Sequence, residues 1–349
     1  MKYEKRLVVD FDDTLFFTKN RDWENAEPNL ELIEKINGLY EEGWRVDIFT
    51  ARGSISCDSR EQAKEKYLNG MLRLLEKYNV MYHEISFEKP LAAYYIDDKS
   101  ITPEEFIKKD FKQLQGGLSG SDIYTDGEQV HKTDDNSHNV VEWYNATNNI
   151  LNTPEIHRVV GNTVSMEYIE HNESFFESNV YFALALIQES LDSMRKLKPI
   201  NNLRFSDYKK RILTNHLKPA LENDSLSKQQ KKVLLITYEN LSLIDVNPSF
   251  SHGDFGIKNM LFTEGKKLYL IDPIPQTFGS LEIDVAKFIA SMYINEYNEQ
   301  LINTSLKTLC TFNGLELSLI NKLISSELMR VVKYHPDPEK IVELISNVY

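Results

Sequence analysis

The chain has 349 residues, of which 41% are hydrophobic and 11% aromatic, and its formal net charge is −13. This length and composition favour two folded domains with packed cores and argue against a disordered chain. The net charge is −6 over residues 1–110 and −7 over the rest, so broad binding to a nucleic-acid backbone is disfavoured.

The cysteines and the apolar runs indicate the cellular compartment of the protein. The two cysteines, Cys57 and Cys310, form no disulfide framework and lie in no recognisable motif, which predicts a reducing compartment and two packing residues. The N-terminal apolar run reaches Asp10 too soon for a signal peptide, and residues 181–187, the longest apolar stretch, are too few to span a membrane. We therefore expect a soluble cytoplasmic protein without membrane insertion.

Strand-like and helix-like segments alternate over residues 1–110. The expected elements are, in order, strand 6–9, helix 28–43, strand 44–50, helix 59–79 and strand 92–98. This order predicts an α/β domain with a doubly wound parallel sheet. Ligands bind at the carboxyl ends of such strands, where Asp10, Thr50 and Asp97 are expected to lie.

Beyond residue 110 the pattern becomes that of an α+β domain. Residues 111–134 predict antiparallel strands around a glycine-rich loop and a tight Asp126-Gly127 turn. The elements expected next are helix 139–151, strand 162–171 and mainly helices over 174–247 and after 279. We place the domain boundary between residues 110 and 111, and the absence of a Pro/Ser-rich linker predicts that the domains abut.

Three aspartates follow the first expected strand in "VVDFDDTLFF", residues 8–17. Neighbouring carboxylates such as those of Asp10 and Asp12 repel one another unless a cation lies between them, and Mg²⁺ prefers such oxygen ligands. The sequence therefore predicts a magnesium site here, with a solvated turn as the alternative. Asp13 is expected to be a turn or N-cap residue rather than a ligand.

Residues at the later strand ends complete a recognisable order. The order is Asp10-x-Asp12-x-Thr14, Thr50, Lys89 and Asp97-Asp98. It resembles the haloacid dehalogenase-like (HAD) phosphohydrolases over residues 1–110. The resemblance implies that Asp10 attacks phosphorus and becomes an aspartyl-phosphate, while Asp12 protonates the leaving oxygen and then activates water.

The same resemblance assigns the remaining polar residues. Thr50 and Lys89 would hold the transferring phosphoryl group, and Asp97 or Asp98 would complete the Mg²⁺ site formed with Asp10 and Asp12. The short gaps between these motifs leave no room for a cap domain. "DFDDTL", "FTARGS" and "YYIDDKS" look most like the small capless phosphatases of bacterial capsule and surface-polysaccharide gene clusters.

A second motif, "HGDFGIKN", occupies residues 252–259, and Asp272 of "LYLIDP" lies thirteen residues after Asn259. The pair resembles the aminoglycoside phosphotransferase and choline kinase-like group over residues 111–349. That resemblance implies a two-lobed protein-kinase-like fold, with an N-lobe over 111–170 and a C-lobe over 171–349. Asp254 would orient or deprotonate the acceptor hydroxyl, while Asn259 and Asp272 would hold Mg²⁺ against the phosphates of ATP or another nucleoside triphosphate.

Weaker signals upstream agree with this order. Gly116, Gly117 and Gly120 would let backbone N–H groups approach the phosphates, although a flexible turn is the alternative. Lys132 would contact the α- and β-phosphates and pair with Glu142 on the following helix. A solvated lysine and an exposed helix glutamate are the alternatives for these two residues.

The remaining assignments come from the same resemblance. The backbone of Glu167 and Tyr168, in "SMEYIEH", would bind adenine. His252 is expected to be a structural loop residue rather than an acid–base catalyst. Asp284 would steady the catalytic loop, with an N-cap role as the alternative.

Together the two halves predict a bifunctional phosphatase/kinase that acts on sugar or polyol phosphates and on hydroxyl acceptors in surface-polysaccharide precursor synthesis. An aminoglycoside- or choline-like kinase stays open, with Glu170, Glu173 and Glu177 as candidate contacts for a cationic acceptor. A chain in which one half is catalytically inactive and acts only as a binding or scaffolding module also stays open. A nucleic-acid end-repair enzyme is disfavoured because the chain has no P-loop motif. The sequence also leaves open a homo-oligomer.

Overall fold

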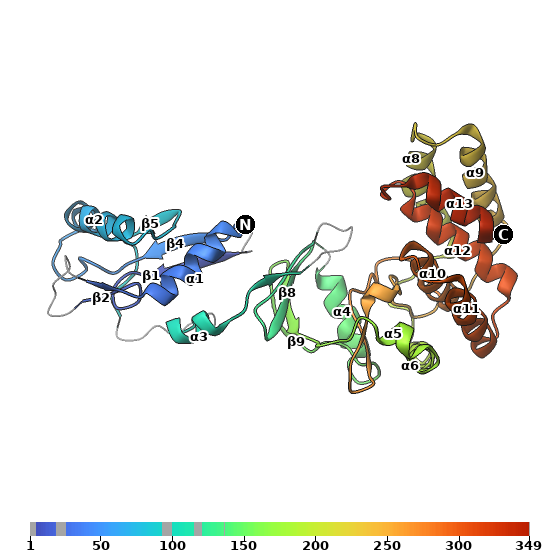
Figure 1. Cartoon of the computed structure of the whole chain (residues 1–349), viewed down its shortest axis with the longest axis horizontal. Helices are drawn as coiled ribbons and strands as arrows, with labels where there is room; N and C mark the ends of the chain where they lie inside the picture. Colours follow the sequence, from blue (N-terminus) through green and yellow to red (C-terminus); the bar gives the residue numbers. More distant parts are fainter. Residues whose placement is uncertain (1–4, 19–25, 93–99, 115–120, 136, 349) are drawn as a thin grey trace. The chain divides into compact units, whose positions relative to one another are not determined.

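The computed structural model describes residues 5–18, 26–92, 100–114, 121–135 and 137–348. The chain divides into two compact units, Met1–Phe111 and Lys112–Tyr349 (Figure 1). This division falls one residue after the boundary expected from the sequence. Among the described helices, none combines the length and apolarity needed to cross a membrane.

The first unit contains a three-stranded parallel sheet with the strand order β1-β4-β5. Its strands are β1 (Arg6–Asp10), β4 (Arg45–Phe49) and β5 (Glu84–Ser86). The strand expected at 92–98 falls almost entirely on residues outside the described ranges, whereas β5 was not predicted. In the sheet, Asp10 pairs with Phe49, so Asp10 and Thr50 lie at the same carboxyl edge.

Capping and turn residues mark the ends of helix α1 (Leu30–Glu41) in the first unit. The unit also contains helices α2 (Arg60–Lys77) and α3 (Pro103–Lys108), and a two-stranded ribbon pairs β2 (Phe16–Phe17) with β3 (Glu27–Pro28). The Asn29 side chain accepts the Leu32 N–H and so caps α1. Gly43 follows α1 with φ +86°, a conformation that glycine adopts without steric cost.

The second unit begins with a five-stranded sheet in the order β6-β7-β8-β10-β9, with every neighbouring pair antiparallel. Its strands are β6 (Lys112–Gln113), β7 (Asp122–Thr125), β8 (Gln129–Thr133), β9 (Ile156–Val160) and β10 (Thr163–Glu167). Strand β9 was not predicted. Helix α4 (Ser137–Thr147) begins two residues before the expected start and buries Trp143 completely.

The rest of the second unit is mainly helical, as expected. The first set is α5 (Phe175–Ser178), α6 (Val180–Met194), α7 (Phe205–Ile212), the π-helix η1 (Leu213–Leu217), α8 (Lys218–Leu221) and α9 (Lys228–Ser242). After the 3₁₀ turn η2 (Ile257–Asn259) and the hairpin of β11 (Met260–Phe262) and β12 (Leu268–Leu270) come α10 (Leu281–Ile294), α11 (Glu299–Asn313), α12 (Leu317–Val331) and α13 (Pro338–Val348).

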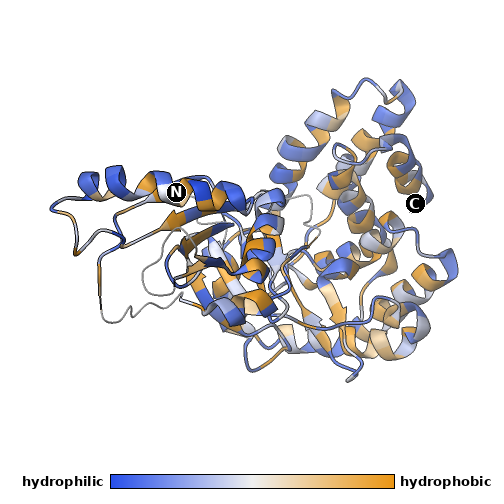
Figure 2. Ribbon diagram, turned by 60° about the vertical axis from the view of Figure 1, so that its left-hand side comes forward, coloured by the Kyte–Doolittle hydropathy of each residue, from blue (hydrophilic) through white to orange (hydrophobic). Residues whose placement is uncertain are grey.

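One hydrophobic core holds these helices together. Helix α10 packs against α12, and fully buried side chains such as Phe288 and Leu328 belong to a cluster that also includes Trp143 of α4. Figure 2 shows that hydrophobic and hydrophilic residues alternate along the helices, as burial of one face requires. The loop between α9 and β11, which carries "HGDFGIKN", is thereby held against the buried side of α10.

Candidate functional site

Asp254 lies between an amide and an ammonium group. The Asn259 Nδ2 donates to Asp254 Oδ2 at 2.9 Å and to the Asp254 carbonyl at 2.8 Å. The Lys287 Nζ, from α10, lies 3.2 Å from Asp254 Oδ1. Burial opposes ionisation, but the Lys287 ammonium and then the Arg330 guanidinium hold the pKa of the Asp254 carboxyl below its usual range. Asp254 is therefore an ionised carboxylate in a fixed orientation.

Helix α10 braces the loop that carries Asp254. The Asp284 carboxylate accepts the N–H groups of His252 at 2.9 Å and Gly253 at 3.2 Å. Gly253 has φ +76°, and a Cβ there would lie 2.2 Å from the Ile274 carbonyl oxygen. Only glycine therefore fits this point of the loop. The bracing role of Asp284 matches the expectation drawn from the sequence.

His252 has no exposed surface, and its ring is held as a neutral acceptor. Its Nδ1 accepts the Asp254 N–H at 3.3 Å, and its ring meets Trp143 edge-on with centroids 5.1 Å apart. Burial lowers the pKa of His252 to about 4. The Trp143 Nε1 in turn donates to the Ser251 carbonyl at 2.9 Å. These contacts give His252 a structural role.

A buried ionic network stands behind Lys287. Glu327 of α12 lies 3.8 Å from the Lys287 Nζ and also pairs with Arg330. The Tyr208 hydroxyl donates to Glu327 Oε1 at 2.6 Å. Burial disfavours the charged form, but Arg330 and then Lys287 keep the pKa of Glu327 below its usual value. Lys287, Glu327 and Arg330 were not singled out from the sequence.

The side chains of Asn259 and Asp272 carry oxygen atoms that can bind a metal ion, and the backbone brings the two residues close to one another. Both hydrogen bonds of the Asn259 amide use its Nδ2, which leaves its Oδ1 available to a cation. The Asn259 carbonyl accepts the Ile271 N–H at 3.0 Å, which brings the backbone before Asp272 alongside Asn259. An amide oxygen and a carboxylate are the hard ligands that Mg²⁺ prefers, so the donor set fits this ion. Among the described residues, no group of three or more His, Cys, Asp or Glu side chains forms a metal cluster.

Asp272 adopts φ +59° and is tied to the N-terminal sheet of its unit. Its N–H donates to the Tyr144 hydroxyl at 3.3 Å. The Lys132 Nζ of β8 forms an ion pair with Asp272 Oδ1. The Lys132–Glu142 pair expected from the sequence is not found among the described residues, and Glu142 is exposed on α4. Lys132 instead meets a partner 140 residues away, which helical spacing could not indicate.

The segment expected to bind adenine follows β10. The Glu167 N–H donates to the Glu155 carbonyl and the Tyr168 N–H to the Glu128 carbonyl, so neither N–H is available to a base. The N–H of the next residue, Ile169, makes no hydrogen bond within the described part of the chain. Gly116, Gly117 and Gly120 lie outside the described residues, so their predicted phosphate contacts stay predictions.

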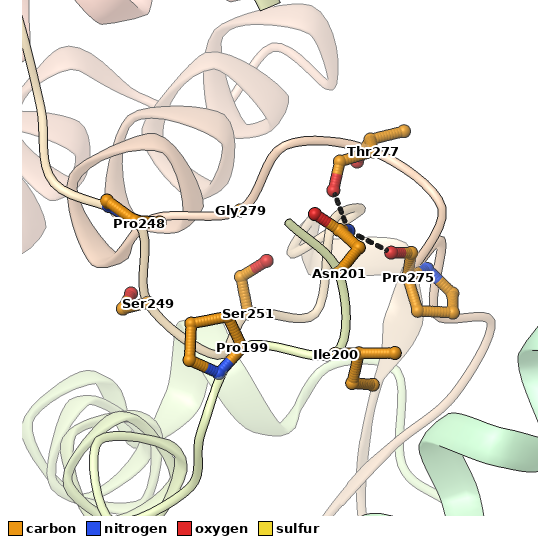
Figure 3. A pocket seen from close by; sticks show the side chains of 9 residues that line it. All are labelled: Pro199, Ile200, Asn201, Pro248, Ser249, Ser251, Pro275, Thr277 and Gly279. Atoms are coloured by element: carbon orange, nitrogen blue, oxygen red, sulfur yellow. Dashed lines mark hydrogen bonds between the residues drawn. The ribbon is translucent and has the colours of Figure 1, made fainter. Parts of the chain in front are cut away.

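Figure 3 shows a small cavity beside the loop that carries Asp254, lined by Ser251 and by residues of the segment after Asp272. The Asn201 side chain donates to the Pro275 carbonyl at 2.7 Å and to the Thr277 carbonyl at 2.8 Å, as the dashed lines mark. Asn201 thereby fixes the segment that packs against Gly253. None of the residues that line this cavity is charged.

In the first unit, Asp10 and Lys89 form an ion pair at the sheet edge. The Lys89 Nζ lies 2.7 Å from Asp10 Oδ2, and the Phe11 N–H donates to Asp10 Oδ1 at 2.9 Å. Burial raises the pKa of the Asp10 carboxyl despite the hydrogen bond and charge of Lys89. The structure thus joins two residues that the sequence separates by 79 positions.

Asp12 is held by Arg52 and Thr50. The Thr50 Oγ1 donates to Asp12 Oδ2 at 3.2 Å, and the Arg52 Nε donates to Asp12 Oδ1 at 3.1 Å. Arg52 and Thr50 thus engage both oxygens of Asp12, and the charge of Asp12 also acts on the Asp10 carboxyl. The expected roles of Asp12 in proton transfer and in a Mg²⁺ site stay predictions. Arg52 is almost fully buried and needs a counter-charge. Its role was missed, because a lone arginine after a strand carries no distinctive spacing.

Two further expectations concern acidic residues of the first unit. Asp13 is exposed with φ +57°, and its N–H donates to the Phe16 carbonyl, which matches the expected turn residue. Asp97 and Asp98 lie outside the described residues, so their part in a Mg²⁺ site stays a prediction.

Solved structures share the fold of the kinase-like part. A choline/ethanolamine kinase family protein from Mesorhizobium loti matches 69% of this chain and 87% of its own chain, with a TM-score of 0.53 and 12% identity. A mutant of the aminoglycoside phosphotransferase APH(4)-Ia, in a ternary complex with ADP and hygromycin B, matches 70% and 95%, with a TM-score of 0.52 and 13% identity. The chain thus has an aminoglycoside phosphotransferase/choline kinase-like fold over about 70% of its length.

The other comparisons give no further support for a fold or a family. A target protein from Vibrio cholerae is 32% identical over 30% of this chain and 89% of its own, but its TM-score of 0.28 supports no argument. No protein-family model and no curated protein matches the chain. The resemblance of residues 1–110 to HAD phosphohydrolases therefore stays a prediction.

Proposed function

We propose that the second unit is a small-molecule kinase, which transfers the γ-phosphoryl group of ATP or another nucleoside triphosphate to a hydroxyl group. The observation that carries this proposal is the arrangement of Asp254, fixed between Asn259 and Lys287 on a loop that Asp284 braces. Positioning and charge neutralisation are what phosphoryl transfer requires of a protein. The shared fold supports the proposal but does not identify the acceptor.

In the proposed reaction, the acceptor oxygen attacks the γ-phosphorus while the bond from that phosphorus to the β–γ bridging oxygen breaks. Asp254 orients the acceptor hydroxyl and takes its proton, and the nucleoside diphosphate leaves. Lys132 is the cation available to the phosphates, and the Ile169 N–H is the backbone donor available to the base. Asn259 and Asp272 would hold Mg²⁺, which would neutralise charge on the phosphates.

The proposal is tested by measuring nucleotide consumption with a panel of sugars, polyols, amino alcohols and aminoglycosides. Asp254→Asn should reduce kcat by about 100-fold or more, because general-base catalysis typically contributes 10²–10⁴-fold. Asp224→Asn, at an exposed aspartate outside the site, is the matched control and should be unchanged. If no acceptor stimulates consumption, or if Asp254→Asn retains full activity, the proposed function is wrong.

As a second candidate function, the first unit would hydrolyse phosphate monoesters with Asp10 as the nucleophile. The contact of 2.7 Å between Lys89 and Asp10 favours this reading, because a carboxylate that attacks an anionic phosphate needs a cation beside it. Sugar or polyol phosphates of surface-polysaccharide synthesis are the proposed substrates. Release of inorganic phosphate from such esters, lost in Asp10→Asn, is the result this candidate requires.

A further inference from the structure

A basic pocket adjoins the catalytic loop of the second unit. Its lining includes Arg211, Lys287 and Arg330 together with Gly253, Thr277 and Phe278. Gly253 directly precedes Asp254, and Lys287 contacts the Asp254 carboxylate. The pocket has room for only a small group, such as an anionic oxygen, and a group there lies beside Gly253 and Lys287, which adjoin the proposed catalytic base.

The three cations of the pocket differ in their pairing. Lys287 is paired with Asp254, and Arg330 is paired with Glu327. Within the described part of the chain, the half-buried Arg211 guanidinium has no hydrogen bond and no ion pair. The donors of Arg211 are therefore not taken by another described side chain, although the Glu327 charge acts on Arg211 from farther away.

The surroundings of Arg211 make this charge costly in the empty pocket. Burial, and then the neighbouring Arg330 guanidinium, lower the pKa of Arg211. A half-buried guanidinium without a hydrogen-bonded partner is stabilised when an anion accepts hydrogen bonds from it, and a planar guanidinium fits carboxylate and phosphate oxygens in pairs.

The backbone holds Arg211 in this place. Arg211 lies in the last turn of α7, immediately before the π-helix η1, and π-turns recur at functional sites. In η1, the buried His216 ring lies with its Nδ1 3.2 Å from the Arg330 carbonyl oxygen and donates to it. This bond ties α12, which carries Arg330, to the π-helix that directly follows Arg211 and Ile212, and both arginines line the pocket.

The lining of the pocket favours an anion over a cation. Of the described residues that line it, none is acidic. The Glu327 carboxylate, which contacts the lining residues Lys287 and Arg330, is already engaged by these two residues and by Tyr208. The acidic residues suggested from the sequence for a cation, Glu170, Glu173 and Glu177, are all exposed and do not line this pocket.

We infer that the acceptor of the kinase reaction carries an anionic group, a phosphate ester or a carboxylate, which Arg211 binds while a hydroxyl of the same molecule meets Asp254. This inference rests on the proposed kinase function and adds to it the chemical class of the substrate. Lys287 stays paired with Asp254, and Arg330 stays paired with Glu327.

The test compares wild-type protein with Arg211→Gln and with Lys210→Gln. Lys210 is an exposed cation on the same helix and serves as the matched control. The acceptors are matched sets of one neutral polyol, its phosphate monoester and the corresponding carboxylic acid. Inorganic phosphate is used as the probe in calorimetric binding and as an inhibitor competing with the acceptor. Thermal unfolding establishes that each variant is folded.

We expect transfer to an anionic member of the set and competition by inorganic phosphate. Arg211→Gln should raise KM for that acceptor by about 10- to 100-fold, because it removes a charge-assisted contact, while KM for the nucleotide and the behaviour of Lys210→Gln stay unchanged. The anionic acceptor that the enzyme phosphorylates more efficiently shows whether the substrate carries a phosphate ester or a carboxylate.

Other outcomes overturn the inference in separable ways. Transfer only to neutral or cationic acceptors, or a wild-type KM for the anionic acceptor in Arg211→Gln, leaves the kinase function standing and removes the anion site. If no acceptor is phosphorylated, the proposed function fails. In that case, phosphate binding that Arg211→Gln abolishes still supports an anion site, and absence of phosphate binding overturns it.

Discussion

The Lys287 ammonium lies 3.2 Å from the Asp254 carboxylate and also donates to the Gly253 carbonyl, one residue away. One side chain of α10 therefore fixes both the backbone and the functional group of the catalytic loop. Because Lys287 is only 9% exposed, it holds this position without competition from bulk solvent.

Substitution Lys287→Met should lower kcat of the kinase reaction by about 10-fold or more with a smaller effect on KM for the nucleotide, since it loosens Asp254 rather than the nucleotide site. Steady-state kinetics with the best acceptor measures this split. Lys267→Met, at an exposed lysine of the β11–β12 hairpin, is the control. Equal loss of kcat in both variants would contradict the role given to Lys287.

Substitution Gly253→Ala should destabilise the second unit by about 2 kcal/mol or more and remove kinase activity, because alanine is strained at φ +76° and its Cβ would meet the Ile274 carbonyl. Denaturant unfolding measures the stability. Gly256→Ala is the control in the same loop, because its Cβ would meet Ser291 only at 3.4 Å. A Gly253→Ala protein as stable as Gly256→Ala would show that the loop is not held as described.

Lowering the pH should destabilise the protein through the buried histidine of η1. Burial, and then Arg330, lower the pKa of His216 to about 4 in the folded state, whereas its ordinary value is 6.5. The unfolded chain binds this proton first, so the stabilisation is complete above pH 6.5 and is lost as the pH falls towards 4. The difference corresponds to about 3 kcal/mol.

The free energy of unfolding at pH 7 and pH 4.5 measures this effect. His216→Gln keeps a donor for the Arg330 carbonyl and should show a shallower decrease than the wild type. His138→Gln, at an exposed histidine, should follow the wild type. A His216→Gln curve parallel to that of the wild type would mean that His216 is not the titrating group.

In the first unit, Asp10→Asn and Lys89→Met should each abolish release of phosphate from phosphate monoesters and leave nucleotide consumption by the second unit unchanged. Asp13→Asn should retain phosphatase activity, because asparagine tolerates φ +57° and the side chain is exposed. A colorimetric phosphate assay measures all three variants. Loss of activity in Asp13→Asn alone would require a different nucleophile.

The sequence predicts best what lies within one short segment. Asp254 and Asn259 are five residues apart, and one loop brings them together at 2.9 Å. The kinase-like fold that their motif indicated is confirmed by the solved structures. Strands β5 and β9 were missed because three to five residues without clear alternation carry little periodic signal.

Partners far apart in the chain could not be predicted. The resemblance to the kinase-like group implied a pair of Lys132 and Glu142, but tertiary packing brings Lys132 to Asp272 instead. Lys287 and Arg211 lie on helices whose sequences read as ordinary amphipathic segments. Their roles depend on which helices meet behind the catalytic loop, and only the folded arrangement determines that.

The most direct test of the central claim is ³¹P NMR of the complete reaction with nucleotide, Mg²⁺ and the acceptor panel. A kinase at Asp254 predicts a new phosphomonoester resonance that forms at the rate at which the nucleoside triphosphate disappears, and that is absent with Asp254→Asn. Nucleotide loss that yields inorganic phosphate alone, or a phosphomonoester that forms equally fast with Asp254→Asn, would contradict the account.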